Sequence, residues 1–143
     1  MARRIRNAKV LWIEADPVFG GSQSQVQFPV ELSAFFGLPQ GAVRGAARQV
    51  GVSIAGVDFP AKKMDFHHNQ MWRLNLPTRR QGLGGYIHMI LAFEKTEHEY
   101  RFRIWILEPA TPLARKLRSA SRATGFNSST QREDGSRRSF GYF

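Results

Sequence analysis

The chain has 143 residues, which is enough for one domain with a substantial core. It carries 21 Lys and Arg against 11 Asp and Glu, a formal net charge of +10, and it contains no Cys. This composition excludes disulfides and thiolate zinc sites, and the basic surplus favours phosphate-bearing partners. No apolar run approaches the roughly 20 residues that span a bilayer, so we expect no membrane partner and a cytoplasmic location.

Short strands separated by Pro and Gly are predicted in the first half of the chain. Residues 9–14 are rich in branched and aromatic side chains, which indicates an opening strand, followed by a loop over 16–21. Residues 25–28 begin a second strand, and Pro29 ends it and starts a short helix over 30–36 that stops at Gly37. Alternating apolar residues over 50–54 predict a further strand, which Pro60 closes.

The second half shows clearer alternation. Residues 63–67 indicate a short strand, and in the next one Trp72 points to the core while Arg73 and Asn75 share the other face. Residues 86–94 and 100–107 predict a hairpin, and Trp12 and Trp105 are also expected in the core. A helix over 112–121 should start at an N-cap Thr111. Residues 126–143, rich in Ser, Asn and Arg, predict a flexible basic tail or linker.

These elements sum to a mainly β fold, a β-rich α+β domain. We expect about six or seven strands and two short helices, arranged as a barrel or pseudobarrel. The sequence therefore predicts one folded domain over 1–125, with 126–143 outside it.

Three stretches carry a resemblance to a known family. Residues 20–29 form a Gly-rich loop that runs into a strand, Pro29 and a short helix; residues 72–75 precede Arg79, Arg80 and a Gly-rich turn; residues 85–94 precede 104–106 and an amphipathic helix. Their order resembles the effector-binding DNA-recognition domain of EcoRII-type restriction endonucleases, which shares a DNA-binding pseudobarrel with the plant B-three transcription-factor domains.

The resemblance implies a specificity or effector domain of a bacterial restriction–modification enzyme, whose nuclease domain is absent from this chain. In that family two arms grip the major groove of double-stranded DNA, and by position they correspond here to 21–25 and about 67–80. The N-terminal arm of the family tends to carry His where this chain has Gln23. A CCWGG-like recognition site therefore does not transfer directly.

The side chains of these segments agree with that function, because Gln and Asn bond to adenine edges and Arg to guanine. The residues expected to read bases are Gln23, Ser24, Gln25, Arg73 and Asn75. The residues expected to contact phosphates, which position without specifying, are Ser22, Lys62, Lys63, His68, Arg79 and Arg80. The alternative for Arg73 and Asn75 is an ordinary solvated strand face, and for Gln23 and Gln25 plain turn residues.

No catalytic or metal site is expected, and no cofactor or small-molecule substrate. His67 and His68 have no further ligand at zinc-site spacing, and Glu94, Glu97 and Glu99 are typical of a solvated hairpin turn. Two other functions stay open: an RNA-binding or ribosome-associated module, which would expose aromatic side chains for stacking, and a self-contained magnesium-dependent nuclease.

Overall fold

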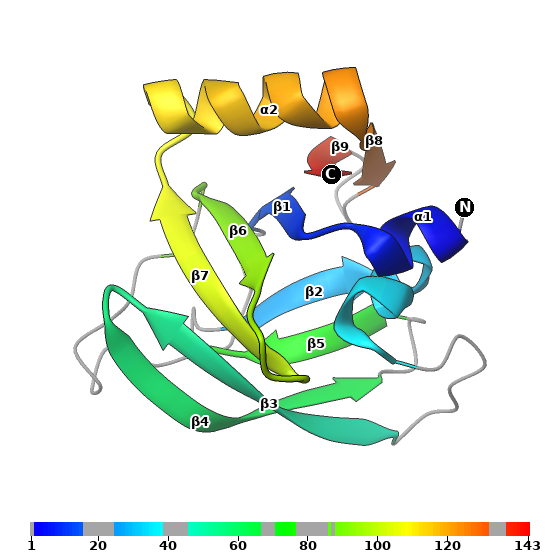
Figure 1. Cartoon of the computed structure of the whole chain (residues 1–143), viewed down its shortest axis with the longest axis vertical. Coiled ribbons are helices and arrows are strands. Elements are labelled where there is room, and N and C mark those ends of the chain that lie inside the picture. The colour runs from blue at the N-terminus through cyan, green and yellow to red at the C-terminus, as the bar shows by residue number, and fades with distance from the viewer. Residues whose placement is uncertain are drawn as a thin grey trace.

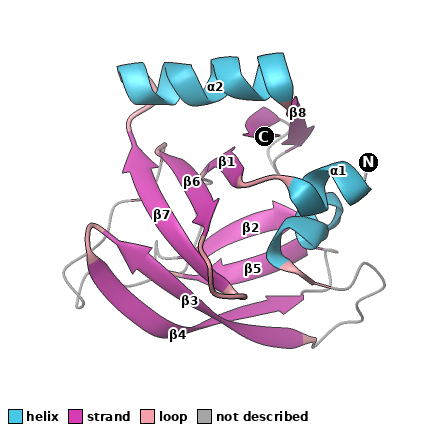
Figure 2. Cartoon of the chain, viewed as in Figure 1, coloured by secondary structure: helices cyan, strands magenta, loops and turns pink. Residues whose placement is uncertain are grey.

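The computed structural model describes residues 2–15, 25–38, 46–66, 71–76, 86, 88–131 and 137–143. The fold is mainly β, as predicted, and its strands form one nine-stranded sheet that curls into a nearly closed barrel (Figure 1, Figure 2). The strands are β1 (Val10–Glu14), β2 (Gln25–Pro29), β3 (Ala47–Ile54), β4 (Val57–Phe66), β5 (Met71–Asn75), β6 (Ile90–Lys95), β7 (Arg101–Leu107), β8 (Phe126–Gln131) and β9 (Arg137–Tyr142). The helices are α1 (Ala2–Asn7), the 3₁₀ helix η1 (Val30–Phe36) and α2 (Pro112–Thr124).

The sheet order is β2-β5-β4-β3-β7-β6-β1-β9-β8. All neighbours are antiparallel except β3 and β7, which pair in parallel from Gly51↔Arg101 to Ile54↔Ile104. This parallel pair joins two antiparallel groups, β2-β5-β4-β3 on one side and β7-β6-β1-β9-β8 on the other. The barrel therefore depends on contacts between segments distant in sequence.

Aromatic side chains fill the inside of the barrel. The Phe36 ring lies 4.8 Å from Phe28, 5.5 Å from Phe93 and 5.2 Å from Phe102, centroid to centroid, so η1 inserts its aromatic residues between strands of both groups. Phe–Phe pairs at such distances add to the stabilisation from apolar burial. Gly37 ends η1 with φ 72°, a left-handed conformation that glycine adopts without strain.

Helix α2 covers the outer face of β1 and β6, where Ala114 packs with Trp12, Ile90 and Ala92. Strand β6 is thus buried on both faces. Thr111 caps the helix as predicted, accepting a hydrogen bond from the Ala114 backbone N–H at 3.3 Å. Figure 1 shows α2 at the opposite end of the molecule from β3 and β4.

The prediction of a flexible tail is wrong for residues 126–131 and 137–143. They form β8 and β9, and β9 pairs with β1 from Leu11↔Tyr142 to Ile13↔Phe140. Phe140 and Tyr142 are buried in the barrel core, which is why this polar segment is ordered.

Other predictions need correction as well. The described residues form nine strands rather than six or seven, and α1 adds a helix that the sequence did not indicate. Pro60 lies within β4 instead of ending a strand, because a register shift opposite Gly51 leaves a bulge where a missing N–H is tolerated.

Trp105 was expected in the core but is 45% exposed, since it lies on the outer side of β7. Among the residues that the structure describes, no helix has the length and apolar character needed to cross a bilayer.

Candidate nucleic-acid interface

A polar face covers the outside of β2, β5, β4 and β3. Val26, Phe28, Trp72, Leu74 and Met64 point into the barrel, so the residues between them point outward. The strand registers align the outward residues in two rows. One row is Gln25, Asn75, Lys63 and Gln49, and the other is Gln27, Arg73, Asp65 and Ala47. We call these two rows the outer polar face.

Gln25 and Asn75, two expected base-reading residues, contact each other. Gln25 Nε2 donates to Asn75 Oδ1 at 2.7 Å, and Asn75 Nδ2 donates to the carbonyl oxygen of Lys63 at 3.2 Å. Both ends of the Asn75 amide are therefore engaged, whereas the Gln25 carbonyl oxygen accepts no bond from a described residue. In this arrangement Asn75 orients Gln25, and Gln25 is the amide with spare hydrogen-bonding capacity.

Arg73 lies between Gln27 and Asp65 on the outer polar face, partly buried. Its Nε is buried and meets no hydrogen-bond acceptor among the described residues. A buried donor without a partner costs about 1–3 kcal/mol, so a ligand that offers an acceptor here would gain from it. The guanidinium is also a permanent cation with a planar fork that suits guanine or phosphate.

The two lysines expected to bind phosphate do not lie together. Lys63 is exposed on the outer polar face, opposite Gln49. Lys62 pairs with Val50 and shares its face, and its Nζ lies 5.5 Å from the centroid of the Phe59 ring. Neighbouring residues on a strand point to opposite sides, so the sequence pair Lys62-Lys63 is split.

Six expected contact residues lie outside the described residues: Ser22, Gln23, Ser24, His68, Arg79 and Arg80. Chain connectivity still relates their segments to the sheet. Residues 16–24 lead directly into Gln25. Residues 77–85 begin directly after Leu76, and Leu76 is the residue next to Asn75 in sequence. Because Gln25 pairs with Asn75, both segments join the sheet at the same end. Residues 67–70 connect β4 to β5 and join it at the opposite end.

Two polar residues on this face were missed in the sequence. Gln27 lies two positions after Gln25 on β2, and Gln49 ends the row that begins at Gln25. The spacing of Gln25 and Gln27 was a usable signal, because alternate strand residues share a face. Gln49 could not be assigned without the register of β3 against β4.

The hairpin carboxylates have other contacts or are exposed. Glu94 pairs with Arg103 at 2.5 Å, and Glu97 and Glu99 lie exposed at the turn. Within the described ranges, no group of three or more His, Cys, Asp or Glu side chains is placed to hold a metal ion.

No family model and no curated protein matches the chain. The function proposed below is therefore argued from the sequence and from the geometry of the outer polar face.

Proposed function

We propose that this chain binds double-stranded DNA in a sequence-specific manner, with the outer polar face against the major groove. In this proposal Arg73, Gln25 and Gln27 contact base edges, Asn75 orients Gln25, and Lys63 contacts phosphate. Because the chain resembles EcoRII-type recognition domains in the order of its motifs, we further propose that it is the specificity or effector domain of a bacterial restriction endonuclease.

One observation carries the proposal: the buried Nε of Arg73, which meets no acceptor among the described residues, lies beside two half-buried glutamines on the outer polar face. Amides and a guanidinium on a common face are the groups that read base edges. The net charge of +10 supplies the general attraction to a polyanion.

The test is a selection from randomised duplexes with the purified chain, followed by anisotropy titrations on the selected and a scrambled duplex. We expect a motif of a few base pairs. Arg73→Gln should lose about 1–3 kcal/mol of discrimination at one base pair and keep most nonspecific affinity. Lys63→Gln should weaken all duplexes alike and lower the salt slope by about one.

Arg103→Gln is the matched control, because it removes the same charge from β7, outside the four strands that carry the outer polar face. It should leave discrimination unchanged. The proposal fails if the selection yields no motif, or if Arg103→Gln and Arg73→Gln change discrimination equally.

An RNA-binding module is the second candidate, and one observation favours it: Trp105 is 45% exposed on a strand. Exposed indoles stack on unpaired bases, typically worth about 1–3 kcal/mol per base. Competition of single-stranded RNA against duplex DNA separates the two. RNA preference that is lost in Trp105→Ala would replace the duplex proposal.

A further inference from the structure

A small pocket lies at the end of the β6–β7 hairpin, and none of its lining residues belongs to the outer polar face. Its volume is about 220 Å³, and it is bounded by α1, the end of η1 and the hairpin residues 95–102. All of its lining residues belong to the described part of the chain. The pocket has no role in the proposed DNA contact, so any ligand that it binds must be inferred from its own lining.

The polar part of the lining is mainly cationic. The lining contains three cationic side chains, Arg6, Lys95 and Arg101, and one carboxylate, Glu99. Arg101 is engaged with Asp58 at 3.4 Å, but neither Arg6 nor Lys95 forms an ion pair with a described residue. Two positive side chains that form no ion pair within the described part of the chain therefore lie beside the cavity, near the Glu99 carboxylate.

Lys95 is the more constrained of the two. Its Nζ donates to the backbone carbonyl oxygen of Arg6 at 2.6 Å and lies 4.7 Å from the centroid of the Phe35 ring. Burial and the positive charge of Lys9 lower the pKa of Lys95. The ammonium is thus held in place, partly desolvated, with donors left for an anion.

Aromatic rings form the apolar part of the lining: Phe35 and Phe102 are buried behind it, and Tyr100 is half-buried at its surface. Gly37 allows Tyr100 to approach, because a Cβ at Gly37 would lie 2.9 Å from Tyr100 Cε1. The combination of ring surfaces with a fixed ammonium suits a ligand that has a flat apolar body and one negative group.

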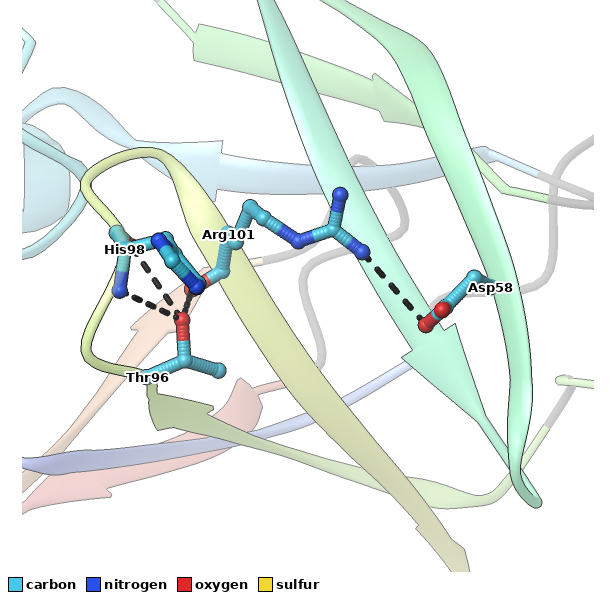
Figure 3. A network of polar contacts seen from close by, with 4 residues as sticks. All are labelled: Asp58, Thr96, His98 and Arg101. Atoms are coloured by element: carbon cyan, nitrogen blue, oxygen red, sulfur yellow. Dashed lines mark hydrogen bonds and ion pairs between the residues drawn. The ribbon is translucent and has the colours of Figure 1, made fainter.

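The hairpin that carries the pocket is braced on both sides. Thr96 Oγ1 accepts the His98 backbone N–H at 3.2 Å and donates to the Arg101 carbonyl oxygen at 3.0 Å (Figure 3). Figure 3 also shows Arg101 reaching across to Asp58 on β4. The lining is therefore largely preformed, which lowers the entropic cost of binding.

Size decides which anions fit. A cavity of roughly 150 Å³ accommodates benzene, whereas sites for drug-sized ligands run from about 300 Å³ upward. At about 220 Å³ the pocket fits one ring with a carboxylate and is too small to enclose a nucleotide. We propose that this pocket binds a small aromatic carboxylate, with Lys95 and Arg6 contacting the carboxylate and Tyr100 contacting the ring.

The test is isothermal titration calorimetry of the full chain with benzoate, acetate and benzamide. Benzoate should bind at one site. Acetate lacks the ring and benzamide lacks the charge, so each should bind at least about tenfold more weakly. Lys95→Met and Arg6→Gln should each weaken benzoate by about tenfold, and Glu99→Gln should strengthen it by removing a repelling charge.

Lys116→Met is the control, since Lys116 lies exposed on α2 and does not line the pocket. It should leave benzoate affinity unchanged, and circular dichroism checks that each variant is folded. If Lys95→Met does not fold, Arg6→Gln and the ligand series on the unmodified chain still decide the matter. The proposal is wrong if benzoate gives no saturable heat, if acetate or benzamide binds equally well, or if Arg6→Gln changes nothing.

Discussion

Arg138 Nη1 donates a hydrogen bond to the carbonyl oxygen of Gln27 at 2.6 Å, joining β9 to β2 across the opening of the barrel. Its Nε donates to the carbonyl oxygen of Glu14 at 2.9 Å. The residue is 1% exposed, so a buried guanidinium connects the end of β1 to the middle of β2. Arg138 therefore ties together the two strands that residues 16–24 connect.

Replacing Arg138 by Met should destabilise the fold by about 2–4 kcal/mol, because two buried carbonyl oxygens lose their donors. Urea unfolding followed by tryptophan fluorescence measures the change. Arg137→Met is the matched control, since Arg137 is exposed on the same strand. Equal midpoints for the two variants would show that Arg138 does not hold the barrel closed.

Gly141→Ala should destabilise the chain by about 1–3 kcal/mol through overpacking. A Cβ at this position would lie 2.6 Å from Trp12 Nε1, which donates to Ser121 Oγ at 3.2 Å. The variant should lower the thermal midpoint and shift the tryptophan emission. Ser139→Ala, two residues earlier on β9, should change neither. A Gly141→Ala protein as stable as the parent would contradict this packing.

Ala55→Asn should stabilise the β3–β4 hairpin. Its two-residue turn has φ 51° at Ala55 and 81° at Gly56, a left-handed pair that Ala disfavours and that Asn-Gly favours. We expect a gain of about 0.5–1 kcal/mol in the free energy of unfolding. Denaturant titration measures it, with Ala47→Asn, at an exposed strand position, as the comparison. A loss of stability in Ala55→Asn would refute the turn assignment.

Gln25 and Asn75 should be energetically coupled. A double-mutant cycle with Gln25→Ala and Asn75→Ala should give an interaction energy of about 0.5–1 kcal/mol, as for a cross-strand side-chain pair. Gln27→Ala combined with Asn75→Ala should be additive by comparison, because Gln27 pairs with Arg73 instead. If the stability losses of Gln25→Ala and Asn75→Ala simply added in the double variant, Asn75 would have no orienting effect on Gln25.

Lys95 makes stability depend on pH at the alkaline end. Burial and Lys9 lower its pKa in the folded chain below the ordinary lysine value of 10.5, so the unfolded chain binds the proton more tightly. The protonated lysine therefore costs stability at neutral pH, and this cost disappears as pH rises from the folded pKa to the unfolded one. The stability of Lys95→Met relative to the parent should fall over that window. A difference that is independent of pH would contradict the lowered pKa.

Local patterns in the sequence were sufficient for several elements. The alternation of Trp72 and Leu74 with Arg73 and Asn75 predicted the two faces of β5, and both apolar residues are buried as expected. Thr111 and Pro112 predicted the start of α2, because capping chemistry is local. Pro29 and Gly37 likewise bracketed η1.

The remaining features depend on contacts that local sequence does not encode. Residues 126–143 have the composition of a tail, and they are ordered because β9 finds β1, more than a hundred residues away in sequence. Trp105 was expected in the core as a large apolar residue, but it shares its strand face with Arg101 and Arg103, and α2 covers β1 and β6 and leaves that indole outside. The bonding of Asn75 to Gln25 and Lys63 also required the registers of three strands.

The place of β9 between β1 and β8 has a consequence for synthesis on the ribosome. Strand β1 is synthesised more than a hundred residues before β9, one of its two partners in the sheet. Until then one side of β1 presents unpaired backbone amides to other nascent chains, so co-translational misassembly should be most acute in this interval. A stop codon introduced just before β9 would make that exposure permanent.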